Sequence, residues 1–350
     1  MFKNSTLLIT GGTGSFGENF INHIIIKKIN FKKIIIYSRD EYKQSLLESK
    51  IPLKLRKKFR FLLGDIRDLN RLKFAFQGVD YAIHAAALKQ VPKAEYNPFE
   101  FIKTNVIGSQ NIVEAAIENN VKKVVALSTD KASSPINLYG ATKLCSDKIF
   151  TSANNIKGDR EIVFSVVRYG NVFGSRGSVV PFFLNIKKNI FPITHNDMTR
   201  FNINLDQAID LVLWTFKNSF GGDVIVPIIP SYKLLDLAKA INHKAKFSIV
   251  GIRPGEKIHE EMISENESRN VMMLKDKYII MSEFNINDAK NHYLKFKGSK
   301  LNKKIFTYSS DQKKYLDDAS LKKLLFDFKK INEILWLPMV SNILITTISN

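Results

Sequence analysis

A glycine-rich loop lies directly after the first apolar run of the chain, and it constrains the fold more than any other feature. Residues 7–10 read Leu-Leu-Ile-Thr, residues 11–17 read Gly-Gly-Thr-Gly-Ser-Phe-Gly, and apolar residues at helical spacing follow. Glycines at the first, fourth and seventh places of such a loop allow a tight turn, close approach of a pyrophosphate, and close packing of a helix on a strand. The N–H groups and the dipole at a helix start also attract phosphate. The loop therefore predicts a dinucleotide site, with contacts expected from Gly11, Thr13, Gly14, Ser15, Phe16 and Gly17.

Short apolar runs alternate with helical patterns through the first half of the chain. Besides 7–10, strands are expected at residues 34–37, 59–63, 81–84, 124–128 and 163–167. Apolar strands separated by helices are typical of a parallel sheet covered on both faces, and right-handed crossovers make such a sheet doubly wound. The predicted fold class is therefore α/β, with a doubly wound parallel sheet of the Rossmann type and a smaller α/β substrate-binding lobe.

The pattern becomes irregular after Arg168. We expect a loop around residues 192–195, helices over 205–218 and 232–242, and a loop over 251–256 that enters a helix. The length of 350 residues favours about two domains. The predicted division is a dinucleotide-binding domain over 1–170, a substrate-binding lobe over 171–330 with segments that return to the first domain, and an apolar tail over 331–350 that docks or contacts another copy.

Lysine and arginine outnumber aspartate and glutamate by 53 to 33, which gives the chain a formal net charge of +20. The lysines are scattered among isoleucine and asparagine, without a basic helix, zinc-finger spacing or aromatic RNA-binding signature. We therefore interpret them as solvated surface charges rather than as a nucleic-acid site, although their field attracts phosphate-bearing small molecules.

One cysteine, Cys145, excludes an intramolecular disulfide framework, and we expect it to lie in the core. No apolar stretch reaches the roughly 18 residues of a membrane-spanning helix, and the first residues enter the strand and glycine loop directly, which is unlike a signal peptide. The expectation is a cytoplasmic protein without a membrane span. His84 and His259 have no metal-ligand companions, so we interpret both as packing or hydrogen-bonding residues and expect no metal.

The end of the second predicted strand bears on which dinucleotide binds. An Asp or Glu there usually accepts from the ribose 2′-hydroxyl of NAD, whereas an arginine accommodates the 2′-phosphate of NADP. Ser38, Arg39 and Lys43 favour NADP, and Asp40 is able to cap the next helix instead of binding ribose. A solvated charge cluster is the alternative interpretation. Further cofactor contacts are expected at the ends of the third and fourth strands, from Asp65, Ala85 and Ala86.

Tyr139 and Lys143 lie four residues apart, on one face of a predicted helix after the fifth strand. A free tyrosine has a pKa of about 10, and a nearby lysine cation favours the phenolate. Such a pair removes a proton from a sugar hydroxyl while hydride leaves the same carbon.

The end of the fifth strand carries Thr129, Asp130 and Lys131, where ligands bind in open α/β sheets. Thr129 supplies a hydroxyl for the reacting oxygen. Asp130 and Lys131 form an acid/base pair beyond what plain dehydrogenation requires. A surface ion pair without chemistry is the alternative.

These segments together resemble a known family. The glycine loop, Tyr-Ser-Arg-Asp-Glu at 37–41, His-Ala-Ala-Ala-Leu-Lys-Gln at 84–90, Ser-Thr-Asp-Lys-Ala at 128–132 and Tyr-Gly-Ala-Thr-Lys at 139–143 are similar to the extended short-chain dehydrogenase/reductases. Within that superfamily the chain resembles the configuration-inverting UDP-N-acetylglucosamine 4,6-dehydratases that open pseudaminic acid synthesis. The similarity covers about residues 5–285, through the blocks at 168–179, 198–201 and 251–260.

The resemblance implies a mechanism. Tyr139, assisted by Lys143 and Thr129, deprotonates the sugar O4 as hydride passes from C4 to NADP⁺. The resulting ketone acidifies the C5 proton, which Lys131 removes while Asp130 protonates the departing C6 hydroxyl. Hydride then returns to C6, and C5 is reprotonated on the opposite face.

A lysine base must be neutral, so we expect the pKa of Lys131 to lie below its free value of about 10.4. An Asp130 carboxylate beside it favours the ammonium. Desolvation must therefore prevail, or Asp130 must be protonated.

The resemblance further implies cofactor contacts from Ile66, Lys89, Tyr139, Lys143 and Val172, and UDP-sugar contacts from Lys89, Asn171, Arg200, Arg253 and Glu256. It also implies a homo-oligomer and a downstream aminotransferase of the same pathway. Two alternatives stay open: a nucleotide-sugar 4-epimerase or reductase, which does not need Asp130 and Lys131, and a non-catalytic cofactor-binding module.

Overall fold

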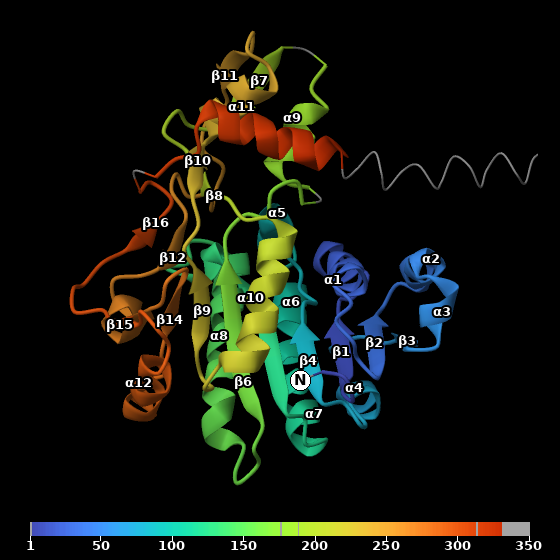
Figure 1. Ribbon diagram of the computed structural model, residues 1–350. Helices are drawn as coiled ribbons and strands as arrows, with labels where there is room; N and C mark the ends of the chain where they lie inside the picture. The colour runs from blue at the N-terminus through green and yellow to red at the C-terminus, as the bar shows by residue number, and fades with distance from the viewer. Residues whose placement is uncertain (1, 176, 188, 313, 331–350) are drawn as a thin grey trace, which may run out of the picture.

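A computed structural model describes residues 2–330, apart from 176, 188 and 313 (Figure 1). The predicted apolar tail over 331–350 lies outside the described residues. The strands of the first half are β1 (Thr6–Thr10), β2 (Lys33–Ser38), β3 (Phe59–Leu63), β4 (Tyr81–His84), β5 (Lys123–Thr129) and β6 (Val163–Tyr169). All pair in parallel, which confirms the predicted fold class.

Helical segments connect these strands. They are α1 (Ser15–Ile26), α2 (Glu41–Lys50), α3 (Leu53–Arg56), α4 (Leu69–Ala75), α5 (Val91–Tyr96), α6 (Pro98–Phe101), the π-helix η1 (Ile102–Ile107), α7 (Gly108–Glu118), the 3₁₀ turn η2 (Asp130–Ala132) and α8 (Leu138–Ile156). The strand order runs β6-β5-β4-β1-β2-β3, so the direction of winding reverses between β1 and β4. Open α/β sheets bind ligands at the carboxyl ends of the strands beside such a reversal.

The second half adds α9 (Val179–Leu184), β7 (Ile190–Ile193), β8 (Thr199–Phe201), α10 (Leu205–Asn218), β9 (Val224–Pro227), β10 (Ser231–Lys233), α11 (Leu234–Ile241), β11 (Lys246–Ile249), β12 (Glu261–Ile263), η3 (Glu267–Asn270), β13 (Val271–Met273), β14 (Lys277–Ile280), α12 (Ile286–Leu294), β15 (Lys300–Leu301) and β16 (Tyr308–Ser309). Residues 318–330 are also helical. β9 pairs in parallel with β6, and β14, β13 and β15 extend the same sheet to ten strands.

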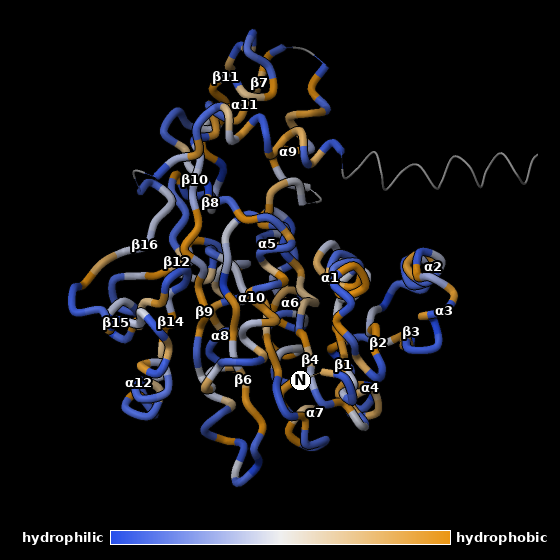
Figure 2. Tube along the Cα trace, in the orientation of Figure 1, coloured by the Kyte–Doolittle hydropathy of each residue, from blue (hydrophilic) through white to orange (hydrophobic). Residues whose placement is uncertain are grey.

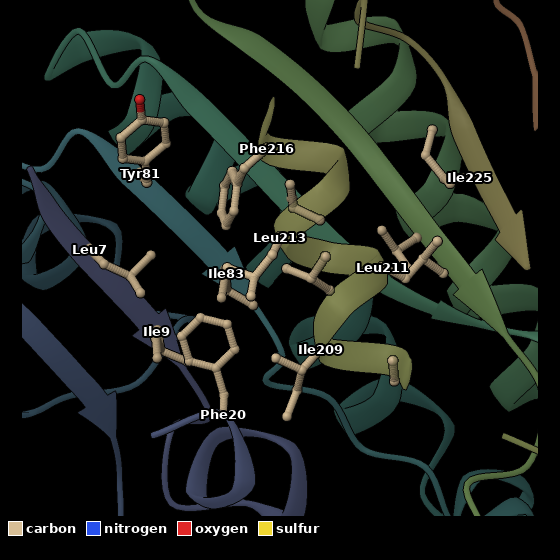
Figure 3. Packing of buried hydrophobic residues seen from close by; sticks show 14 of the residues in the cluster. Leu7, Ile9, Phe20, Tyr81, Ile83, Ile209, Leu211, Leu213, Phe216 and Ile225 are labelled. Carbon is tan, nitrogen blue, oxygen red and sulfur yellow. The ribbon is translucent and has the colours of Figure 1, made fainter. Parts of the chain in front are cut away.

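The two faces of the large sheet carry different helices. Alternate strand residues such as Leu7, Ile9 and Ile83 face α1 and α10, where Phe20 and Phe216 are fully buried (Figure 3). The opposite face packs on α4, α7 and α8. Each such side chain contributes about 1.5–3 kcal/mol on burial. Hydrophobic residues accordingly concentrate along β1, β2 and β4 (Figure 2).

The helix predicted over 205–218 is α10, and its start shows why it forms there. The Asn204 side chain accepts from the backbone N–H of Gln207, while the Gln207 side chain accepts from the N–H of Asn204. This reciprocal capping satisfies two donors at the helix start. The helix predicted over 232–242 begins two residues later, at Leu234, because residues 231–233 form β10 and pair with β8.

A third hydrophobic cluster joins α9, β7, α11 and the helix at 318–330, at the upper end of the view in Figure 1. The loop predicted around 192–195 is confirmed only at residues 194 and 195, because Pro192 lies inside β7, which pairs with β11 while Phe191 and Ile193 are buried in this cluster. A proline is tolerated there because the sheet has only two strands. The domain boundary predicted at residue 170 stays a prediction.

The helix predicted after residues 251–256 is absent from the structure. The described segment 250–260 is irregular and leads into β12. Gly251 and Gly255 have φ values of +84° and +73°, which interrupt helical geometry, and Asn137 Nδ2 holds the carbonyl of Gly255 at 2.7 Å.

Candidate active site

The glycine loop leads from β1 into α1 at the winding reversal. Gly11 has a φ of +66°, and a Cβ there would lie 2.8 Å from the backbone of Ala86. A Cβ on Gly17 would lie 2.3 Å from the carbonyl of Gly12, so α1 packs closely on the loop. Gly14 caps α1 without a side-chain hydrogen bond, which leaves the N–H groups of the first turn to a ligand. These residues fit the pyrophosphate of a dinucleotide.

The structure brings the cofactor-choice residues together at the end of β2. Asp40 caps α2 by accepting from the N–H of Lys43 at 2.9 Å, as expected, and it also pairs with Lys43 Nζ at 2.9 Å. Arg39 lies 3.6 Å from Asp65, and the side chains of Arg39 and Lys43 are about half exposed. Ser38 is buried and its hydroxyl oxygen accepts from Gln44. Two partly exposed cationic side chains, Arg39 and Lys43, therefore lie just beyond the carboxyl end of β2.

The carboxyl ends of β3 and β4 lie at the same edge of the sheet as the glycine loop and the end of β2. Asp65 is bound by Arg67 through two hydrogen bonds, at 2.7 and 3.0 Å, so its carboxylate already has a partner. Ile66 is buried. The N–H groups of Ala85 and Ala86 bond to Thr10, which joins the start of this loop to β1.

Asp130 and Lys131 lie in η2, immediately after β5. Lys131 Nζ donates to Asp130 Oδ1 at 3.1 Å, and Thr129 Oγ1 donates to the same oxygen at 2.9 Å. The Asp130 side chain is 1% exposed, and its Oδ2 atom has no hydrogen-bond partner among the described residues. Burial raises the pKa of Asp130; Lys131 opposes this rise, and Glu260 adds to it. A protonated Asp130 is what a general acid requires.

Sequence reasoning missed Glu260, which is the second partner of Lys131. Its Oε1 atom accepts from Lys131 Nζ at 2.9 Å and lies 3.5 Å from Arg200 Nε. Its position at the end of the 251–260 block, directly before β12, is the sequence feature that could have marked Glu260 as a site residue.

The expected low pKa of Lys131 was wrong. Burial alone lowers it, but the Asp130 and Glu260 carboxylates outweigh burial and hold the pKa above its ordinary value. In this structure Lys131 is therefore an ammonium between two carboxylates, and it becomes a base only when its proton moves.

Tyr139 and Lys143 lie near the start of α8, which Asn137 caps. Burial raises the pKa of Tyr139 to about 12, although Lys131 and a hydrogen bond with Thr129 act to lower it. Lys143 Nζ donates to the carbonyl of Leu127 at 2.8 Å, and burial lowers its pKa. The phenol thus lies beside the Asp130–Lys131 pair at the end of β5.

The predicted substrate residues divide into two groups. Arg200 lies 3.2 Å from Oε1 of Glu256, and Arg253 lies 3.5 Å from its Oε2. Arg200 also pairs with Glu260. Arg200 is buried whereas the Arg253 side chain is 70% exposed. A cavity of about 520 Å³ lies beside this loop, lined by Glu95, Ile136, Asn137, Leu138, Ala141, Pro254 and Gly255.

The other group follows β4 and β6. Lys89 is exposed on the loop after β4. Asn171 and Val172 follow β6, where Val172 bridges to Ile203, and Asn171 Oδ1 is buried without a hydrogen-bond partner in the described part of the chain.

The cysteine and the two histidines singled out in the sequence lie outside the proton-transfer residues. Cys145 was expected in the core but is exposed on the outer side of α8, because Ser146 and Asp147 take the inward positions. His84 is buried and bonds to Thr10, and burial lowers its pKa to about 3. His259 bonds to Thr199. Within residues 2–330, leaving out the three gaps, no helix has the length and hydropathy to cross a membrane.

The crevice at the end of a doubly wound sheet, with Tyr139 and Lys143 on the helix after β5, defines a protein of the short-chain dehydrogenase/reductase type. The sequence model of the polysaccharide biosynthesis protein family matches residues 7–282, and the chain belongs to that family.

Several relatives and one solved structure are similar over most of the chain. A UDP-N-acetylglucosamine 4,6-dehydratase (inverting) of Campylobacter jejuni is 49% identical over 321 residues, which cover 89% of this chain and 94% of the relative. A UDP-glucose 4-epimerase of Rickettsia bellii is 42% identical and covers 95% of this chain and 98% of its own. The X-ray structure of Pen from Bacillus thuringiensis superposes with a TM-score of 0.84 at 36% identity, covering 94% of this chain and 99% of that one.

Proposed function

We propose that the chain is an inverting UDP-N-acetylglucosamine 4,6-dehydratase. The main observation behind this proposal is the buried cluster of Asp130, Lys131 and Glu260 beside Tyr139. Oxidation at C4 needs the tyrosine, whereas elimination of water needs an additional acid and base. The name and 49% identity of the Campylobacter relative support the proposal.

The cofactor that we propose is NADP. The glycine loop and the uncapped start of α1 fit its pyrophosphate, and Arg39 and Lys43 supply positive charge for its 2′-phosphate. Bound NADP would supply a hydride acceptor for C4 and a hydride donor for C6, so no cofactor would be consumed overall.

The side chains of the site handle the protons. Tyr139 accepts the O4 proton, with Thr129 as hydrogen-bond partner and Lys143 behind it. Lys131 removes the C5 proton that the neighbouring ketone acidifies. Asp130, whose pKa is raised by burial, donates a proton to the C6 hydroxyl so that it leaves as water. Reprotonation of C5 on the opposite face inverts that centre.

The UDP-sugar lies, in this proposal, across the loops after β6 and before β12. Arg200 and Arg253 provide guanidinium groups for the diphosphate, and Asn171 provides an amide for hydroxyl or uracil edges. We propose Lys89 as a contact shared by cofactor and substrate. We propose that an aminotransferase consumes the ketone product. We also propose that the enzyme acts as a homo-oligomer.

A 4-epimerase is the second candidate, because relatives with that name share 42% identity. It uses Tyr139 in the same way and returns the hydride to C4.

Proton NMR of the products separates the two functions. UDP-N-acetylglucosamine is incubated with the purified protein and NADP in deuterated water. We expect a 4-keto-6-deoxy sugar of inverted C5 configuration with deuterium at C5. Conversion to the 4-epimer, with C6 still hydroxylated and no deuterium at C5, would overturn the dehydratase proposal.

A further inference from the structure

Glu260 is a buried charge at the centre of the site to which the proton transfers above give no role. Its side chain is 2% exposed, its Oε1 atom accepts from Lys131, and its Oε2 atom is buried without a hydrogen-bond partner among the described residues. A buried carboxylate with one oxygen unbonded destabilises the fold unless its position serves another purpose.

The backbone and neighbours of Glu260 hold it in place. Its N–H donates to Ser310 Oγ at 2.8 Å, and its carbonyl accepts from the N–H of Ser310 at 2.8 Å. Arg200, on the other side, donates to the carbonyls of Thr199 and Ile258 at 2.7 and 3.1 Å. Lys131 is the most exposed member of the cluster, at 25% of its side chain, whereas the side chains of Asp130, Glu260 and Arg200 are at most 9% exposed.

The charges of the cluster fit the proton requirement of the elimination. With Lys131 as ammonium and Asp130 as carboxylate, neither can act. Transfer of one proton from Lys131 Nζ to Asp130 Oδ1, across 3.1 Å, creates a neutral amine and a carboxylic acid together. The amine then takes the C5 proton and the acid gives its proton to the departing hydroxyl, which forms the C5–C6 double bond and water. The cluster is thereby returned to its starting ionisation.

We propose that Glu260 is a positioning residue for this internal proton transfer. Its carboxylate accepts an N–H from Lys131 before and after the transfer, which fixes the direction of the amine lone pair. Its charge also retains the shared proton in the cluster as the pH rises. This inference rests on the proposed dehydratase function.

The expected pH effect follows from the charged groups around the cluster. Asp130, Glu260, Arg200 and Tyr139 face Lys131, while Lys257 and Tyr232 act on it or its partners from outside. Activity is lost at high pH when the shared proton leaves and no acid remains. Because Glu260 helps to hold the pKa of Lys131 above its ordinary value, removing its charge moves this loss to lower pH.

The test compares Glu260→Gln, Glu260→Asp and the control Glu261→Gln, whose carboxylate accepts from Ser133 and Ser134 instead. Steady-state water loss from UDP-N-acetylglucosamine is measured across pH. For Glu260→Gln we expect kcat to fall about 100-fold, the size of a misplaced reacting group, with KM unchanged. The alkaline limb of kcat should move about 1–3 pH units downward. Glu260→Asp should lower kcat but keep the wild-type limb, and the control should match wild type.

The outcomes distinguish this inference from the function on which it rests. A Gln variant with wild-type kcat, or with lowered kcat and an unmoved alkaline limb, overturns the positioning role while the dehydratase function stands. If the Gln variant does not fold, an Asp variant whose alkaline limb moves with its kcat overturns it equally. A wild-type protein that removes no water overturns the proposed function itself.

Discussion

The side chains at the end of β2 lie apart from those that handle protons, so cofactor choice is testable on its own. Arg39 and Lys43 each pair with a carboxylate and keep about half of their side chain exposed. In the Arg39→Ala/Lys43→Ala double variant we expect affinity for NADP to fall about tenfold per lost contact, because each charge-assisted hydrogen bond to the 2′-phosphate disappears. Affinity for NAD should hardly change.

Titration calorimetry with each dinucleotide measures both affinities. An equal loss for NAD and NADP would show that the two cations do not read the 2′-phosphate. The same result would favour the alternative interpretation of Arg39 and Lys43 as a solvated charge cluster.

Residue identities were predictable where chemistry follows from local spacing, and less so where it depends on long-range contacts. Tyr139 and Lys143 are one helical turn apart, so the sequence placed them on one face. Glu260 lies 129 residues from Lys131, and only the folded chain brings them together. The expected low pKa of Lys131 was wrong because the Asp130 carboxylate, which is next to it in sequence, and this distant carboxylate together outweigh burial.

At the scale of elements, a buried ionic network joins β6, α8 and η3. Arg168, 1% exposed, donates to Asp147 at 3.1 Å and to Glu267 at 2.9 Å. Arg168→Ala leaves the buried Asp147 and the partly buried Glu267 without this cation, so we expect the free energy of unfolding to fall by about 3–5 kcal/mol. Chemical denaturation measures the loss. The exposed Arg160→Ala serves as the control and should change stability by about 0.5 kcal/mol or less. Equal stability of the two variants would contradict the structural role of this network.

The strands of the first half were predictable because each is a short apolar run between helical patterns, and β3 and β4 match their predicted bounds. β7 was missed because proline is usually read as a break, whereas pairing with β11 decides its conformation. The segment after Gly255 was predicted to start a helix, but it is irregular, and the Asn137 side chain donates to the carbonyl of Gly255.

At the scale of the whole molecule, the sheet continues beyond the part that the sequence pattern indicated. β9, β13, β14 and β15 follow residue 170 and still join the first sheet. Which strands pair could not be read from periodicity, because pairing depends on contacts between segments distant along the chain. The site is therefore assembled from both halves: η2 and α8 from the first, and Arg200 and the 251–260 segment from the second.

In the proposed mechanism, oxidation at C4 precedes removal of the C5 proton, and Lys131 performs the second step. Lys131→Met keeps an unbranched side chain that is one atom shorter, and it cannot accept a proton. A single turnover of this variant with NADP and UDP-N-acetylglucosamine, followed by absorbance of the reduced nicotinamide and by NMR of the sugar, separates the steps. We expect reduced cofactor to accumulate together with a 4-keto sugar that retains its C6 hydroxyl. A 4-keto-6-deoxy product formed at the wild-type rate would contradict it.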